Sequence, residues 1–471
     1  MFLAVVITVI LLALLVSGYW LNSNFQVQRN GMLQISSYPT GATVEVDGEV
    51  SSWLERTNSS KILSSGEHTI TLTKDGYDSW TKVVNISEGL LYRLHYPRLF
   101  LKERSPVAIL DMTKYASATI SSNHNSALLL NDTTKWGFLN LDADEPKLRS
   151  LDISKLFSSI TPSTESEPSH FTGKILQADW DFDSSHVLFK VAKDDNIEWV
   201  LLDVNDIEKS INLTKEFGTN FSRIEILDNN SNTLLAVQNR NLHKIDIPGR
   251  LISAILVANI DDFDHYNNEI VFSAAKDSSE GEVLQNQTSS TDSSTDISTN
   301  VAKQPYYVGY FRLGDTNLTE LTSTATPVNV TISRFYDSKY VTIINEQNVS
   351  IHQKDNFDEG VMEYVLSFVP EKIKVGHDGE FLFFEKSHQL ATLDMEAKAV
   401  REWSIEGVFD WVDNNMLYSI NNGELTVYDF DGLNRRTIAQ NVSSHFPVSI
   451  TNDKWLYYFS DGTLEREQLA N

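Results

Sequence analysis

One phrase, a polar turn followed by a short run of strand-forming residues, recurs from residue 123 to near the end of the 471-residue chain. It reads DSSHVLF from Asp183, DGEFLFF from Asp378 and DKWLYYF from Asp453. The phrase starts eight times, at steps of 35 to 45 residues except for two longer steps of 60 and 70. A period of about 40 residues is the length of one four-stranded propeller blade. The repeat therefore predicts an all-β region made of similar antiparallel sheets.

The two longer steps each contain a low-complexity stretch, at residues 158–170 and 277–303. Without these stretches the eight units share one period, so we predict an eight-bladed β-propeller over residues 98–471, with seven blades as the alternative. The Ser- and Thr-rich stretch 277–303 is expected to be a disordered loop on one propeller face.

The last repeat has room for only three strands before the chain ends. A strand near residues 98–112 could supply the fourth and close the ring. Closure would remove the unpaired sheet edges that an open ring leaves.

Residues 31–97 precede the repeats and show the period-two alternation of half-buried strands. Apolar and polar side chains alternate in ATVEV, from Ala42, and in HTITL, from His68. Asp47-Gly48 follows the first stretch and Asp75-Gly76 follows the second, and this pair favours the positive φ angles of a tight hairpin turn. Such strands and turns together predict a small antiparallel β unit.

The spaced turns and strands of this unit resemble the PEGA domain, a small β-sandwich-like module of bacterial and archaeal surface proteins. The resemblance is carried by Pro39, Gly41, Ala42, Val44, Val46, Asp47, Gly48, Leu63, Gly66, His68, Lys74, Gly76 and Tyr77. Thr40 stands where the family usually has Glu, and SSWLERTN replaces the Gly-x-Thr-Pro stretch after the turn. The family has no established enzymatic role. The resemblance implies either a stiff spacer or a binder of surface polysaccharide.

Two of the later repeats also resemble a known family. VYDFDGLNRRTI and ADWDFDSSHVLF are similar to repeats of TolB-like and PD40-type propellers, in which a turn motif between strands recurs once per blade. This second resemblance implies the same propeller fold that the period predicts, and no particular ligand.

Residues 2–16, FLAVVITVILLALLV, contain no charge, and the apolar run continues to Leu21. About 20 residues of helix cross the hydrocarbon layer of a membrane. Tyr19 and Trp20 would then lie at the level of the headgroups. We predict a transmembrane anchor over residues 1–22, with a cleaved signal peptide as the alternative. Because the segment stands where an export signal would, we expect the rest of the chain outside the cell, bound to the cell membrane by this single pass.

The composition of the chain disfavours one class of partner and excludes several kinds of chemistry. The chain has 64 acidic and 38 basic residues, a formal charge of -26, which disfavours nucleic acid as a partner. It has no cysteine, which excludes disulfides, zinc–thiolate sites, cysteine nucleophiles and a cysteine-attached lipid anchor.

Two acidic stretches are candidate cation sites. Asp179, Asp181 and Asp183 alternate and could bind a hard cation such as calcium, but such acids more often cap turns by accepting backbone N–H bonds. Residues 259–269, NIDDFDHYNNE, are richer in oxygen ligands but lack the glycine and spacing of a calcium loop. Neither a Gly-x-Ser-x-Gly elbow nor a pair of His residues four apart occurs. We therefore predict no catalytic residue, no cofactor and no metal, although paired carboxylates for glycoside cleavage stay open.

These observations favour a membrane-anchored, extracytoplasmic binding or adhesion protein, or an envelope scaffold. Its propeller would bind a surface glycan or an envelope protein. A propeller enzyme acting on polysaccharide is the alternative, and would need acidic and aromatic residues that converge at the channel mouth. A purely structural envelope spacer is the third hypothesis.

Overall fold

The computed structural model describes most of the chain. The described residues are 19–21, 27–50, 56–161, 169–228, 230–276, 305–315, 317–359, 361–376, 379–413 and 415–470. They are almost entirely β-structure: among them the one α-helix is the five-residue α2 (Leu213–Phe217). The predicted all-β class is confirmed. The stretch 277–303, predicted as a disordered loop, lies outside the described residues.

The chain divides into two compact units. The first contains residues 1–114, 380–382 and 390–471, and the second contains residues 115–379 and 383–389. The domain boundary that the sequence places at residue 98 stays a prediction.

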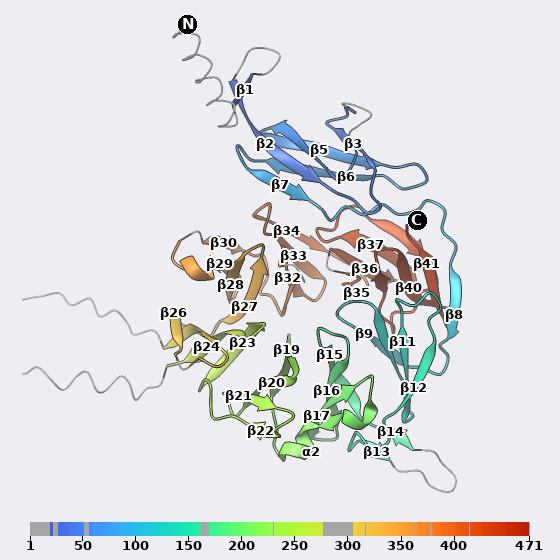
Figure 1. Ribbon diagram of the computed structural model, residues 1–471, viewed down its shortest axis with the longest axis vertical. Coiled ribbons are helices and arrows are strands. Elements are labelled where there is room, and N and C mark those ends of the chain that lie inside the picture. The colour runs from blue at the N-terminus through green and yellow to red at the C-terminus, as the bar shows by residue number, and fades with distance from the viewer. Residues whose placement is uncertain are drawn as a thin grey trace, which may run out of the picture. The chain divides into compact units, whose positions relative to one another are not determined.

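The first unit begins with two small sheets (Figure 1). In one, β2 (Val27–Ile35) pairs antiparallel with β1 (Tyr19–Leu21) and β4 (Ser59–Ser64), and parallel with β7 (Leu91–Leu94). The other has the order β3 (Thr43–Val46), β5 (Gly66–Thr73), β6 (Trp80–Ile86). The alternation is explained by burial, because Leu33, Ile35, Val44, Ile70, Leu72, Val84, Ile86 and Leu94 form the core between these strands.

Both Asp-Gly turns form where the sequence predicts them. Asp47 and Gly48 have φ angles of 53° and 83°, and Val46 and Glu49 exchange two backbone hydrogen bonds across them. Gly76 has a φ of 83° in the turn between β5 and β6.

The predicted membrane segment lies mostly outside the described residues. Its described part, Tyr19–Leu21, is strand β1 and pairs with Val27–Arg29 of β2, so the prediction that the membrane helix continues to residue 22 is wrong. Aromatic residues favour strands, and β2 supplies the backbone hydrogen-bond partners that an isolated helix end would lack. No helix in the described part of the chain is long and apolar enough to cross a membrane.

The first unit ends with sheets of four strands. One has the order β35 (Val408–Trp411), β36 (Met416–Asn421), β37 (Glu424–Asp429), β38 (Arg436–Ala439). The last has the order β39 (Ser449–Thr451), β40 (Trp455–Ser460), β41 (Thr463–Gln468), β8 (Val107–Asp111). Strand β8 pairs antiparallel with β41, which confirms that a segment near residues 98–112 completes the last sheet.

The second unit consists mainly of five such sheets, each with its strands in chain order. Their strands are β9 (Ser117–Ile120), β10 (Ser126–Leu130), β11 (Lys135–Asn140) and β12 (Leu148–Asp152); β15 (Lys174–Trp180), β16 (His186–Lys193), β17 (Asn196–Asp203) and β18 (Ile211–Asn212); β19 (Arg223–Leu227), β20 (Asn230–Gln238), β21 (Asn241–Asp246) and β22 (Leu251–Ile252); β23 (Ile260–Tyr266), β24 (Glu269–Ala275), β25 (Tyr306–Arg312) and β26 (Thr319–Thr324); and β27 (Asn329–Phe335), β28 (Ser338–Asn345), β29 (Asn348–Gln353) and β30 (Met362–Val365). A two-stranded sheet joins β13 (Ile160–Thr161) to β14 (His170–Phe171). Strands β31 (Lys372–Val375), β32 (Phe381–Lys386), β33 (Gln389–Asp394) and β34 (Ala399–Ser404) form a further sheet of the same order.

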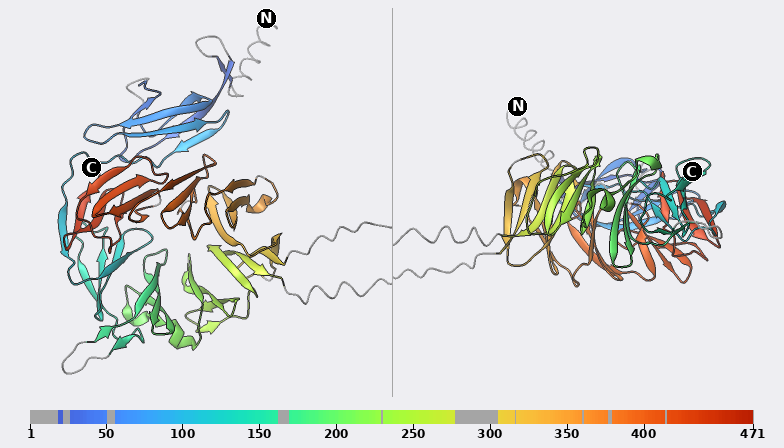
Figure 2. Two further views of the ribbon diagram at one scale, coloured as in Figure 1. Left: turned by 180° about the vertical axis from the view of Figure 1, so that it is seen from behind. Right: turned by 90° about the horizontal axis from the view of Figure 1, so that it is seen from below.

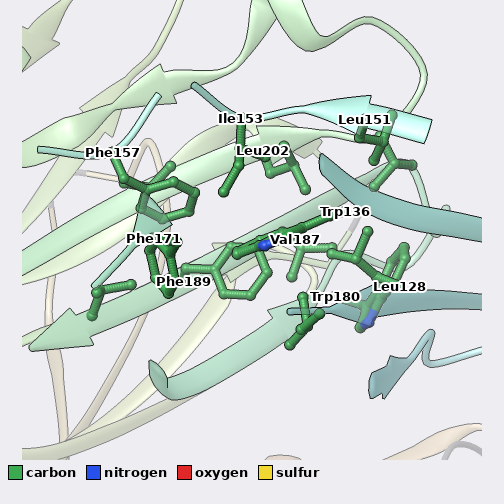
Figure 3. Close-up of a cluster of buried hydrophobic side chains, with 14 residues drawn as sticks. Leu128, Trp136, Leu151, Ile153, Phe157, Phe171, Trp180, Val187, Phe189 and Leu202 are labelled. Atoms are coloured by element: carbon green, nitrogen blue, oxygen red, sulfur yellow. The ribbon is translucent and has the colours of Figure 1, made fainter. Parts of the chain in front are cut away.

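Successive sheets of the second unit pack face to face through apolar clusters. The cluster between β10–β12 and β15–β17 is centred on Trp136, whose ring lies 5.4 Å from the rings of Phe157, Phe171 and Phe189 (Figure 3). Similar clusters join the sheets that begin with β15 and β19, β19 and β23, and β23 and β27, and Figure 2 shows these sheets from two further directions.

Four-stranded antiparallel sheets that pack in this way are the construction of propeller blades. The described residues contain eight of them. Their closure into one ring, and the blade number of eight or seven, stay predictions.

Candidate functional site

The second unit contains a cavity of about 770 Å³. The first strands of successive sheets, β19, β23, β27 and β31, form most of its wall, and Phe182 joins them from the turn after β15. Its lining residues are Phe182, Arg223, Glu225, Asp228, Asp262, Phe263, Asp264, His265, Tyr266, Asn267, Asn329, Val330, Thr331, Ile332, Ser333, Arg334, Glu371, Ile373, Val375, Gly376 and Gly379. Its size falls within the range of about 300 to 1,000 Å³ typical of small-molecule sites.

Arg223 is the centre of the charge network in this cavity. Its guanidinium donates to Asp262 Oδ1 at 2.7 Å, to Glu225 Oε1 at 2.5 Å and to the carbonyl oxygen of Phe263 at 2.8 Å. It also lies 4.3 Å from the centre of the Phe263 ring. Burial disfavours the guanidinium charge, but these carboxylates outweigh it and raise the pKa of Arg223.

For the carboxylates of Glu225 and Asp262, the effect of burial is stronger than that of the ion pair. Burial raises the pKa of each, and this outweighs the lowering effect of the Arg223 charge. Both acids are held in place by Arg223, so their positions in the wall are fixed by an ion pair as well as by the strands.

His265 is buried between two carboxylates, with 8% of its side chain exposed. Its Nε2 lies 3.6 Å from Glu225 Oε2, and its Nδ1 lies 3.4 Å from Asp228 Oδ2. Burial disfavours the imidazolium, but Asp228, Glu225 and Asp264 favour it more strongly and raise the pKa of His265 to about 9. His265 therefore carries a positive charge at neutral pH.

This raised pKa predicts a loss of stability at alkaline pH. The folded-state pKa of about 9 lies above the ordinary 6.5, so the stabilisation is complete below pH 6.5 and is lost as pH rises through 9. The shift corresponds to about 3 kcal/mol. The free energy of urea unfolding of the second unit, measured from pH 6 upward, should fall by about this amount in the wild type and less in His265→Gln. His243→Gln, outside the cavity, is the control, and an equal slope in all three proteins would contradict the prediction.

The acidic stretch 259–269 has a structural role. Asp262 Oδ2 accepts a hydrogen bond from the Val330 backbone N–H at 2.8 Å, and Asp264 Oδ2 accepts one from the Ile332 N–H at 2.9 Å. Alternate carboxylates of β23 thus satisfy backbone donors of β27, the first strand of the next sheet. Within the described ranges no three His, Asp or Glu side chains are arranged to bind a metal ion.

Asp179, Asp181 and Asp183 do not converge. Asp181 Oδ1 accepts from the backbone N–H groups of Ser185 and His186 at 2.8 and 2.9 Å, while its Oδ2 binds the Ser185 hydroxyl and His186 Nδ1, both at 2.8 Å. Asp183 is exposed to solvent. The turn-capping interpretation of Asp181 is therefore confirmed.

Removal of this cap should destabilise the turn that opens β16. Asp181→Ala leaves the Ser185 and His186 N–H groups without their acceptor, and loss of a turn or cap acceptor costs about 1 kcal/mol. Hydrogen exchange at residues 185–187 would report the loss. Asp183→Ala is the matched control on the same turn, and equal protection in the two variants would contradict the expectation.

The residues of the predicted PEGA-like motif have structural roles: some stabilise turns and others are buried in the core. Asp47 Oδ1 accepts from the Thr69 N–H at 2.8 Å and its Oδ2 contacts His68 Nδ1 at 2.7 Å, while Ala42 and Tyr77 are buried. Pro39, Gly41, Gly48, Gly66 and Gly76 lie in turns or beside strand ends. None of these residues lines the cavity.

Sequence reasoning missed Arg223, Glu225 and the role of His265. Each lies in the strand that directly precedes a recurring polar turn, and Arg223, Glu225, Asp262 and Asp264 occupy alternate positions of such strands. One sequence pattern could have predicted this site. In the first strand of each repeat, polar side chains occupy every second position.

Comparison with known proteins gives one family match. Residues 30–97 match the family model described as the PEGA domain. No curated protein matches the chain.

Several solved structures are similar to this chain at low identity. An oligogalacturonate lyase in complex with manganese is 15% identical, with a TM-score of 0.39, and the match covers 62% of this chain and 88% of the lyase. Hsv2 of Kluyveromyces lactis is 10% identical, with a TM-score of 0.41 and coverage of 69% and 98%. Apo AztD from Citrobacter koseri is 9% identical, with a TM-score of 0.36 and coverage of 80% and 91%.

The family match covers most of β2, all of β3–β7 and the turns that carry the motif. Residues 30–97 of this chain are therefore a PEGA domain, as their sequence motif predicted.

Proposed function

We propose that the chain is an extracytoplasmic binding protein whose blade-like sheets hold a polar ligand in the cavity lined by β19, β23, β27 and β31. One observation carries this proposal: a cavity of about 770 Å³ has eight Asp, Glu, Arg and His side chains in its wall, several of them fixed by ion pairs. A ready-made polar site of this size suits recognition of a ligand with many hydroxyl or charged groups.

The cellular setting belongs to the same proposal. PEGA domains occur in surface proteins, and residues 2–16 of this chain form an apolar run without a charge. We infer that the chain is attached to the cell membrane and that its partner is a surface glycan, with an envelope protein as the other candidate.

A polysaccharide-cleaving enzyme is a weaker candidate. Glu225 and Asp262 both have a raised pKa, as an acid catalyst needs, but both are bound to Arg223. A carboxylate held by a guanidinium is poorly placed to give a proton to a leaving group, which favours binding over cleavage.

Binding of purified envelope glycans to the full chain in detergent tests the proposal. Phe182 lies at the cavity and is 52% exposed, and Ile255, outside the cavity, is 53% exposed. Phe182→Ala should weaken glycan binding about tenfold, because an aromatic contact contributes about 1.5 kcal/mol. Ile255→Ala removes a similarly exposed apolar side chain and should change nothing.

Capture of one envelope protein with no glycan retained would overturn the glycan assignment. Binding that is equal in both variants would overturn the cavity as the site. Analysis of the retained glycan for shortened products tests the enzyme alternative in the same samples.

A further inference from the structure

The charges in the cavity wall do not balance. Glu225, Asp228, Asp262, Asp264 and Glu371 are five carboxylates, and the cations are Arg223, Arg334 and the imidazolium of His265. Three positive and five negative groups leave an excess of two negative charges, in a chain whose formal charge is -26. A wall with a net negative charge attracts ligands of the opposite sign, so this wall favours a cationic group.

One of the five carboxylates is placed to meet such a group. Asp228 has 40% of its side chain exposed, whereas Glu225 and Asp262 are occupied by Arg223. Asp228 Oδ2 accepts a hydrogen bond from the Asn267 N–H at 2.8 Å, which fixes the carboxylate at the cavity. An ammonium group of a ligand would find its acceptor at this residue.

Two buried polar groups in the wall make no hydrogen bond within the described part of the chain. His265 Nδ1 and Ser333 Oγ make no hydrogen bond to any described residue, and the 3.4 Å from Nδ1 to Asp228 Oδ2 is longer than a normal hydrogen bond. A buried donor without an acceptor costs free energy, so the wall gains from a ligand that brings oxygen atoms to these positions. Hydroxyl groups meet that need, because they both donate and accept.

Phe182 adds an apolar surface to this polar wall, since about half of its side chain is exposed at the cavity. A ring with one apolar face can lie against it while the ring's substituents reach the polar groups.

We propose that the cavity binds an amino sugar, with its ammonium group at Asp228, its hydroxyls toward His265 and Ser333, and its ring on Phe182. The inference rests on the proposed function, because it names the ligand class of the same cavity.

Calorimetric titration of the full chain with three matched trisaccharides tests the assignment: glucosamine, N-acetylglucosamine and glucose. The glucosamine trisaccharide should bind at least tenfold more tightly than the other two, and higher salt should weaken its binding. Asp228→Asn should lower this affinity about tenfold. The asparagine amide oxygen can still accept the hydrogen bond from the Asn267 N–H. Asp183→Asn, which removes the same charge from an exposed position outside the cavity, should not lower the affinity.

The outcomes separate the inference from the proposed function. Equal binding of all three trisaccharides, weakened by Phe182→Ala, would overturn the amino-sugar assignment and leave glycan binding in place. Spermidine, an amine without a sugar ring, is the further probe: if it binds as tightly as the glucosamine trisaccharide, the sugar part is overturned. Failure of every saccharide and of purified envelope glycans would overturn both.

Discussion

Replacement of Trp80 by alanine is expected to lower the local free energy of unfolding of the PEGA domain by about 3 to 5 kcal/mol. Trp80 is fully buried, and its Nε1 donates to Asp429 Oδ2 at 2.7 Å, 349 residues along the chain. Its ring also makes an edge contact with Tyr96, with ring centres 6.1 Å apart. Alanine would leave a cavity in the first unit and would remove a donor from a buried carboxylate.

Trp80→Phe separates these two effects. Phenylalanine keeps most of the ring volume but has no donor, so we expect a loss of about 1 to 2 kcal/mol. Burial and the neighbouring charge of Asp431 together raise the pKa of Asp429 to about 6, so loss of a donor should make its protonation easier still. Hydrogen exchange of β6 and β37 would measure both losses as changes in local opening. Val83→Ala, at an exposed position of β6, is the control. The packing argument is wrong if phenylalanine costs as much as alanine.

Trp80 is one of several residues of β6 that contact the end of β37 and the turn after it, within the first unit. Lys82 Nζ pairs with Asp431 at 2.8 Å and lies 4.2 Å from the centre of the Phe430 ring. The side chain of Asn434 meets the backbone of Thr81 through its Oδ1, at 3.1 Å, and through its Nδ2, at 3.2 Å. These contacts join β6 of the PEGA domain to the turn after β37. Within the first unit, the PEGA domain and that sheet are therefore held together by ion-pair, hydrogen-bond and ring contacts.

Local features were the ones that the sequence could predict. The turn at Asp47-Gly48 follows from the φ preferences of two adjacent residues, and the sheets follow from a repeated phrase of turn and strand. The addition of β8 to β41 followed from counting strands in the last repeat. Each of these inferences depends on residues that are neighbours in sequence or equivalent in the repeat.

The contacts of Asp429 show why the rest could not be predicted. At the equivalent ends of β17 and β33, Asp203 and Asp394 accept local backbone hydrogen bonds, from Asn205 at 2.8 Å and from Ala397 at 2.9 Å. The same position in VYDFDG predicts the same local cap, yet the carboxylate of Asp429 binds Trp80 and Asn434. Nothing in the repeat marks which copy will meet the PEGA domain. The cavity could not be predicted for the same reason. Its Arg223 and Asp262 pair across two repeats, and the sequence does not record how those repeats lie relative to each other.

Arg98→Met is the second substitution expected to have a large effect, a loss of about 3 to 5 kcal/mol in the first unit. Arg98 is buried and pairs with both Asp413 and Asp453. Those carboxylates raise the pKa of Arg98 although burial opposes its charge. Methionine keeps the apolar stem but leaves the two carboxylates without their cation, and Asp413 is largely buried.

Neutralisation of Asp413 should rescue much of this loss. Asp413→Asn still accepts the N–H groups of Asn415 and Met416 through its amide oxygen, as Asp413 Oδ1 does now at 2.8 Å for both. We expect Arg98→Met/Asp413→Asn to be more stable than Arg98→Met alone, because no buried charge is then unpaired. Asp453 is 52% exposed, so Asp453→Asn should rescue less. A double-mutant cycle on thermal and urea unfolding measures the two couplings. Equal coupling to both aspartates would mean that proximity to Arg98 matters more than burial, and no coupling to either would show that methionine acts only through lost packing.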